Sequence, residues 1–89
     1  MKTVFMTQAL DDLFYWAGTD AKILAKVFNL IADIHRHPHS GLGKPEPLKH
    51  SQHGAWSRRL TQEHRLIYRV TGKGVDQVLE IAQCRGHYT

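Results

Sequence analysis

Cysteine is almost absent from this 89-residue sequence, and it has no long apolar run. The single thiol, Cys84, excludes a disulfide framework and any zinc site that needs two or more thiolates, as is typical of a reducing compartment. No segment approaches the roughly 20 apolar residues that span a bilayer, and the first residues are too short a stretch for a signal peptide. We therefore expect a cytoplasmic protein with no membrane partner.

The length predicts one small domain over residues 1–89, with no room for a second catalytic unit. Hydrophobic residues make up 42% of the chain and charged residues 22%, which is typical of folded globular proteins. A chain of this size buries only roughly 60–65% of the surface that it exposes when unfolded, so we expect a thin core.

Positive charge is concentrated in the second part of the chain. The formal net charge is +4, yet residues 1–35 hold 3 basic and 4 acidic side chains, whereas residues 36–89 hold 9 basic and 4 acidic ones. A polyanion such as a nucleic acid is the natural partner of such a segment. A solvated basic face explains the charge equally well, so the spacing of particular residues has to decide.

Apolar periodicity predicts two helices followed by a small antiparallel sheet, an α+β fold. After a short strand at residues 2–6, Thr7 is expected to cap a helix that ends at Gly18. Thr19 is expected to cap a second helix, which stops before Pro38. The later strands are predicted at residues 55–60, 64–70 and 78–84.

A long loop, residues 37–55, separates the helices from these strands and contains three prolines and three glycines. Loops of this length in small domains are usually either functional or disordered, and we expect this one to carry function. In the strand that follows the loop, Arg58 alternates with Trp56 and Leu60, so we interpret it as structural. In the next strand, the alternation places Arg65 and Arg69 on the polar face.

These residues offer the chemistry that cleaves RNA through its own 2′-OH, without a metal or another cofactor. Glu46 is the only carboxylate in the long loop, and Lys44 and Lys49 are expected to keep it ionised as a general base. Rigidly held Arg59 and Arg65 would stabilise the phosphoryl charge.

Two residues near the chain end complete this hypothesis. As a histidine, His87 would donate a proton to the leaving oxygen, and Tyr88 would stack on a base. The simpler interpretation makes Glu46 a surface ion pair, the arginines solvated edge charges, and the last residues a frayed tail.

Two other function classes remain open at this stage. A noncatalytic nucleic-acid-binding module would use the same basic strands, although it gains little from a carboxylate in its most basic segment. A metal-binding protein would use imidazole ligands, but the spacing matches no closed zinc pattern and Pro38 interrupts it. The histidines in question are His35, His37, His39, His50 and His53.

Four ordered segments closely resemble the YoeB/Txe family of bacterial toxins: residues 43–50, 56–59, 63–68 and 84–88. Residues 11–16 also resemble the first helix of that family. The resemblance covers essentially the whole chain. It implies a RelE-like fold, in which two N-terminal helices pack on a small, mainly antiparallel twisted sheet with the active site on its open face.

The resemblance further implies an endonuclease that cuts messenger RNA in the ribosomal A site. By position in the matching motifs, Glu46 is the general base, His87 the general acid and Arg65 the transition-state cation. The implied substrate-binding residues are Lys49, Arg59 and Tyr88. The implied products are a 2′,3′-cyclic phosphate and a 5′-hydroxyl.

Several partners also follow from the resemblance. They are a cognate antitoxin of the YefM/Axe kind with an acidic C-terminal segment, the 70S ribosome with its messenger RNA, operator DNA bound by the toxin–antitoxin complex, and a second copy of the chain in a homodimer.

Overall fold

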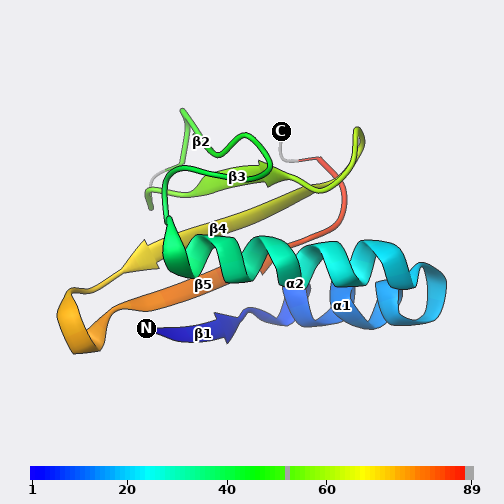
Figure 1. Cartoon of the computed structure of the whole chain (residues 1–89), viewed down its shortest axis with the longest axis horizontal. Helices are drawn as coiled ribbons and strands as arrows, with labels where there is room; N and C mark the ends of the chain where they lie inside the picture. The colour runs from blue at the N-terminus through cyan, green and yellow to red at the C-terminus, as the bar shows by residue number, and fades with distance from the viewer. Residues whose placement is uncertain (52, 88–89) are drawn as a thin grey trace.

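Two helices lie on one face of a five-stranded sheet in the computed structural model, which describes residues 1–51 and 53–87 (Figure 1). The elements in chain order are β1 (Lys2–Phe5), α1 (Thr7–Thr19), α2 (Ala21–Arg36), β2 (Glu46–Pro47), β3 (Trp56–Arg59), β4 (Arg65–Thr71), the 3₁₀ turn η1 (Gly74–Asp76) and β5 (Val78–Gln83). This confirms the predicted α+β fold. Part of the predicted loop, at Glu46 and Pro47, forms the short strand β2.

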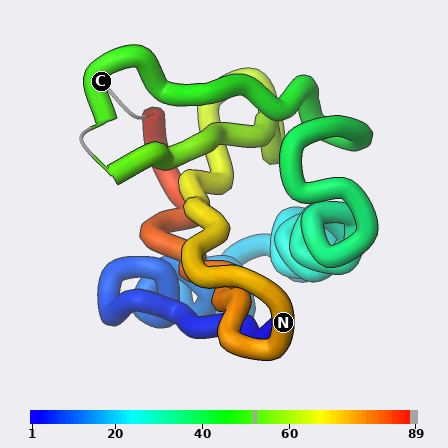
Figure 2. The backbone as a smooth tube through the Cα atoms, turned by 90° about the vertical axis from the view of Figure 1, so that its left-hand side faces the viewer, coloured from blue at the N-terminus to red at the C-terminus, as the bar shows by residue number. Residues whose placement is uncertain are grey.

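The sheet has the strand order β1-β5-β4-β3-β2 and is mainly antiparallel. The first strand lies parallel to the last, whereas the β5–β4, β4–β3 and β3–β2 pairs are antiparallel. The helices connect β1 to the rest of the sheet, and both contribute side chains to one core with β4 and β5. Figure 2 shows α2 end-on beside the strands. Among the described residues, no helix is long and apolar enough to cross a membrane.

Both predicted helix caps were wrong in detail. The residue before α1 is Met6, and no side-chain hydrogen bond caps this helix. The cap of α2 is Asp20, whose Oδ1 accepts hydrogen bonds from the backbone N–H groups of Lys22 at 3.0 Å and Ile23 at 3.2 Å. Thr19 cannot serve as this cap, because it is still the last residue of α1.

The core lies between the helices and the central strands. Its α2 side is an apolar stripe, and its sheet side comes from alternate residues of β4 and β5, as the sequence pattern predicted for Leu66 and Tyr68. The most deeply buried members are Val27, Leu30, Ile34, Leu60, Leu66, Tyr68, Leu79 and Ile81.

A buried arginine fastens the start of the long loop to this core. Arg58 is 0% exposed, and its Nη1 lies 2.5 Å from Oδ2 of Asp33 in α2. Its Nε donates to the hydroxyl of Tyr68 at 3.2 Å, and this hydroxyl donates to the carbonyl of Pro38 at 2.7 Å. The guanidinium also donates to the backbone carbonyls of His37, Ser40 and Leu42. The prediction that Arg58 is structural is confirmed.

Asp33 holds the same loop from the other side. Its Oδ2 accepts the N–H of Leu42 at 3.0 Å; this hydrogen bond and then Arg58 lower the pKa of the Asp33 carboxyl. Gly41 is required beside it, because its φ is +103° and a Cβ there would lie 2.3 Å from Oδ2. Because the folded pKa is depressed, the carboxylate stabilises the fold above its ordinary pKa of 3.8, and this contribution is lost as the pH falls below that value.

We predict that Arg58→Ala lowers the free energy of unfolding by at least about 2 kcal/mol, because the substitution leaves buried carbonyl acceptors without a donor. Urea unfolding followed by circular dichroism measures this change. Arg69→Ala is the matched control, since Arg69 forms a partly exposed salt bridge with Glu80 near the surface, and pairs in contact with solvent contribute less than a fully buried network. Equal stability of the two variants would contradict the structural role of Arg58.

Candidate active site

The register of the sheet brings three predicted site residues onto one face. Glu46 lies opposite Ser57, and Arg59 lies opposite Arg65. Ser57 and Arg59 are two residues apart in β3, so they share a face, as do paired residues of neighbouring strands. Because Arg58 between them points toward α2, the shared face is the one turned away from that helix. The register therefore puts Glu46, Arg59 and Arg65 on the open face, although the sequence pattern predicts a loop at Glu46.

The C-terminal segment places Gly86, the residue before His87, next to the first residue of β4. The backbone N–H of Arg65 donates to the carbonyl of Gly86 at 3.0 Å, and the N–H of Gly86 donates to Nδ1 of His64 at 2.8 Å. Figures 1 and 2 both show this segment, in red, rising from β5 toward the end of β3 and the loop that carries β2. His87 itself is exposed. Tyr88, the predicted stacking residue, lies outside the described residues.

The guanidinium of Arg65 is oriented by its own turn. Nη1 donates to the backbone carbonyls of Thr61 at 2.9 Å, Gln62 at 3.2 Å and His64 at 3.1 Å. Within residues 1–51 and 53–87, no hydrogen bond involves Nε or Nη2 of Arg65. The edge formed by Nε and Nη2 is therefore available to a ligand. An arginine edge of this kind can donate two parallel hydrogen bonds to two oxygens of a phosphate.

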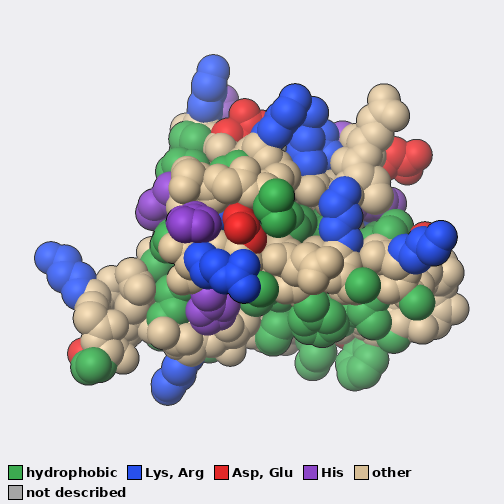
Figure 3. Space-filling model, in the orientation of Figure 1, with side chains coloured by type: hydrophobic (Ala, Val, Ile, Leu, Met, Phe, Trp, Pro, Cys, Tyr) green, Lys and Arg blue, Asp and Glu red, His purple; other side chains and the backbone are tan. Residues whose placement is uncertain are grey.

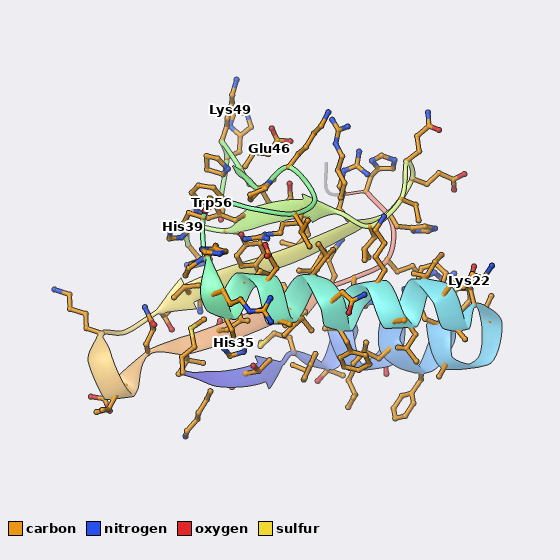
Figure 4. The ribbon with its side chains drawn as sticks, viewed as in Figure 1. Lys22, His35, His39, Glu46, Lys49 and Trp56 are labelled. Carbon is orange, nitrogen blue, oxygen red and sulfur yellow. The ribbon has the colours of Figure 1, made fainter. Side chains whose placement is uncertain are left out.

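Glu46 is exposed, and no ion pair with another described residue holds it. Neither of the two salt bridges in the described part of the chain includes it, so the basic neighbours Lys44 and Lys49 do not pair with it directly. Lys49 lies in the turn after β2, and its side chain points away from the sheet (Figure 4). The structure thus leaves Lys49 apart from the row formed by Glu46, Arg59 and Arg65.

The open face presents fewer cations than the alternation in β4 suggested. Arg69 lies opposite Glu80 of β5, and its Nε is 2.5 Å from Oε2 of that residue, which raises the pKa of Arg69. Ile67, between the two arginines of β4, is only 2% exposed and lines a cavity of about 250 Å³ together with Ser51 and Ala55. The loop after β2 therefore covers the middle of this face, and Arg65 lies at its uncovered end.

Nothing in the described ranges gathers three His, Cys, Asp or Glu side chains closely enough to hold a metal ion. His35 instead lies 2.7 Å from the hydroxyl of Thr3, and the ring of His39 packs on that of Trp56 with 4.4 Å between centroids (Figure 4). These contacts separate the histidines that the metal-binding alternative requires to converge.

Residues 5–88 match the protein family described as the YoeB-like toxin of bacterial type II toxin-antitoxin systems. This chain belongs to the YoeB family. Toxin YoeB of Escherichia coli strain K12 is 51% identical over 88 residues, which are 99% of this chain and 100% of that protein. The chain is accordingly a toxin of a type II toxin–antitoxin system, and the resemblance found in its sequence motifs is confirmed.

Solved structures of the family have the same fold. The YoeB/ParE toxin from Agrobacterium tumefaciens superposes with a TM-score of 0.94 at 51% identity, covering 99% of this chain and 100% of that one. A YoeB dimer from Staphylococcus aureus gives a TM-score of 0.88 at 38% identity, over 99% and 98% of the two chains. YafQ, at 20% identity and a TM-score of 0.70, shares the RelE-like fold over 97% of this chain and 92% of its own.

In this member of the YoeB family, side chains of α1 hydrogen-bond to the backbone of the segment that precedes His87. The sequence pattern did not predict this arrangement. Oδ2 of Asp12 accepts the backbone N–H of Cys84 at 2.9 Å, and Nε1 of Trp16 donates to the Cys84 carbonyl at 2.9 Å. Asp12 is 2% exposed, and Gln8 donates to its other oxygen. The sequence did contain a signal for this contact, because Asp12 lies on the face of the helix that is expected to be buried. A buried carboxylate requires hydrogen-bond partners, so a contact with another segment could have been predicted.

Aromatic residues of α1 make further contacts with and around this segment. The guanidinium of Arg85 lies 3.5 Å from the ring centroid of Tyr15, and the ring of His64 meets that of Trp16 edge-on at 4.8 Å. Cys84 between them is 0% exposed; burial, and then the charge of Asp12, raise the pKa of its thiol to about 12. The thiol is therefore protonated at neutral pH and sterically covered, which makes Cys84 a packing residue.

We predict that Cys84 in the native toxin resists iodoacetamide at pH 8 and that Asp12→Ala increases its alkylation rate about tenfold or more, because the C-terminal segment then opens more readily. Mass spectrometry of quenched samples measures the rate. Asp11→Ala is the control, since Asp11 is exposed on the same helix. Alkylation at the same rate in both variants would show that Asp12 does not hold the segment.

Proposed function

We propose that this toxin is a ribosome-dependent endoribonuclease that cleaves messenger RNA in the A site by metal-independent acid–base catalysis. The observation that carries the proposal is the position of Arg65. Its backbone pairs with Arg59 on one side and hydrogen-bonds to Gly86 on the other, so the strand that presents the cation also fixes the residue before His87. Glu46 faces the same side from β2, two strands away from Arg65 and displaced by two residues along the register.

In the proposed reaction, Glu46 removes the proton of the 2′-OH, and the 2′-oxygen attacks the adjacent phosphorus. The free edge of Arg65, assisted by Arg59, stabilises the charge of the phosphorane. His87 donates a proton to the departing 5′-oxygen as the P–O bond breaks. The products are a 2′,3′-cyclic phosphate and a 5′-hydroxyl, and the protein ends with Glu46 protonated and His87 deprotonated.

The exposure of the site supports dependence on the ribosome. Both Glu46 and His87 are exposed. An open site provides cations and proton donors but little to hold the 2′-OH in line with the leaving oxygen, and that alignment is worth several orders of magnitude in rate. The ribosome would hold the message in the required conformation. Lys49, which projects beyond Glu46, and Tyr88 would contact the RNA there.

The same reasoning extends to the other partners. The family includes a YoeB dimer and a heterotetrameric YoeB-YefM complex, both from S. aureus. By analogy this toxin would form a homodimer and would bind a cognate antitoxin whose acidic C-terminal segment neutralises the basic residues of the second half of the chain. The complex with the antitoxin would bind its operator DNA.

We predict that the wild-type toxin cuts a defined message within the A-site codon of purified ribosomes stalled with an empty A site. His87→Ala should lower the rate by about 10²–10⁴, the usual contribution of a general acid. Mapping of 5′ ends by primer extension measures both. No cutting by folded, antitoxin-free wild-type protein would overturn the proposed activity and favour the noncatalytic binding module.

Glu46→Gln should abolish cleavage while leaving ribosome binding within about twofold of the wild type, because glutamine keeps the shape of the side chain but cannot accept the proton. Glu63→Gln is the matched control, since Glu63 is an exposed carboxylate in the turn before β4. Cosedimentation with ribosomes and end mapping on the same samples separate binding from chemistry. A parallel loss of binding and cleavage would contradict the role of Glu46 as a base.

A further inference from the structure

A basic cavity of about 480 Å³ lies on the helix side of the row formed by Glu46, Arg59 and Arg65. It is bounded by α2, by the loop before β2 and by the end of β3. Its lining includes three cations, one amide and two leucines: Lys26, Lys44, Arg59, Asn29, Leu30 and Leu42. No Asp or Glu from the described part of the chain lines it. Figure 3 shows Lys and Arg side chains gathered on this face, above α2.

The walls of the basic cavity are held in place by the backbone. Gly43 has a φ of +79°, and a Cβ there would lie 3.0 Å from the carbonyl oxygen of Arg59 and 3.1 Å from Cδ2 of Leu30. Its own carbonyl accepts the N–H of Arg59 at 2.7 Å. This close approach fixes the loop against both β3 and α2.

Lys44 is positioned by an unusual backbone conformation. With a φ of +52°, it is the one non-glycine residue in the left-handed region among residues 1–51 and 53–87. That conformation is unfavourable for a non-glycine residue, so it persists only where the surroundings impose it. The hydrogen bond at Gly43 and the Arg58 network upstream impose it here. The lysine is thus carried into the lining of the cavity by an ordered loop.

We infer that this basic cavity binds a phosphate group of the RNA next to the one that is cleaved, and this inference rests on the proposed function. Arg59 is the connecting residue, because it lines the cavity and also lies opposite Arg65 on the open face. A chain whose scissile phosphate sits at Arg65 passes Arg59 and brings a neighbouring phosphate between Lys26 and Lys44. Contacts of this kind position a nucleic acid without reading its sequence.

The chemistry of the lining fits RNA better than an acidic peptide. Two lysines and an arginine around one small volume can together contact both non-bridging oxygens of one phosphodiester. The amide of Asn29 supplies a neutral donor, and Leu30 and Leu42 offer an apolar surface for ribose carbons. Because Arg59 borders both the cavity and the open face, a ligand that contacts it can extend from one to the other. The RNA that is cleaved has to reach the open face in this way.

Binding of a fluorescein-labelled, fully 2′-O-methylated oligoribonucleotide tests the inference, because this probe cannot be cleaved. Lys26→Gln and Lys44→Gln should each weaken binding about threefold to tenfold in fluorescence anisotropy. Each should also reduce the slope of log K against log salt by about 0.7, the value for one phosphate contact on a single strand. Lys22→Gln is the control, since Lys22 lies one turn earlier on α2, away from the cavity (Figure 4).

Cleavage on stalled ribosomes provides a second readout. Loss of a positioning contact should raise KM with kcat within about twofold of the wild type, whereas Lys22→Gln should change neither. If both cavity variants bind and cleave like the Lys22 variant, the cavity inference is wrong and the proposed function stands. If the wild type cleaves no message yet binds the probe through Lys26 and Lys44, the proposed activity fails and phosphate binding at the cavity is supported.

The remaining possible outcome is that the basic cavity binds an acidic peptide and not RNA. A poly-aspartate peptide titrated in the same anisotropy assay detects it by competition. If the two lysine variants lose affinity for the peptide while binding RNA as the wild type does, the cavity is a peptide site and the inference is overturned.

Discussion

The buried pair of Arg58 and Asp33 is the interaction on which the functional end of the molecule depends. A guanidinium with no exposed surface is tolerated only when its donors are paired, and here they pair with one carboxylate, one hydroxyl and three backbone carbonyls. Those carbonyls belong to the loop that leads to β2. The charge buried between α2 and β3 therefore determines where Glu46 enters the sheet, and it holds the loop that carries Lys44 along the basic cavity.

A second set of buried contacts acts on the other end of the site. Asp12 and Trp16 hold the backbone of Cys84, and His64 holds that of Gly86, so an exposed histidine follows a firmly anchored segment. The molecule thus separates its two tasks. Buried polar groups fix the backbone, and the groups proposed to react stay at the surface, where a large partner can reach them. This arrangement suits a toxin of 89 residues, whose core is too thin to enclose an active site.

Four arginines of β3 and β4 show why residue type alone does not assign function. Arg58 is buried with a carboxylate, Arg69 is paired across strands with Glu80, Arg65 is oriented by three carbonyls, and Arg59 borders the basic cavity. Alternation in the sequence correctly separated Arg58 from the others, because it shares a face with apolar residues. It could not separate Arg65 from Arg69, because the partner of Arg69 comes from a strand whose register is set only on folding.

The sequence by itself determined the α+β fold, the two helices, the three later strands, the faces of the sheet and, through its ordered motifs, the YoeB family. These follow from local periodicity and from residues close together in the chain. Only the tertiary structure decided which groups meet. The hydrogen bond between Asp12 and Cys84 joins residues that are 72 positions apart in the chain, and the cavity is lined by residues of α2, a loop and a strand. Such contacts depend on how the helices are oriented on the sheet, and no short-range pattern encodes that orientation.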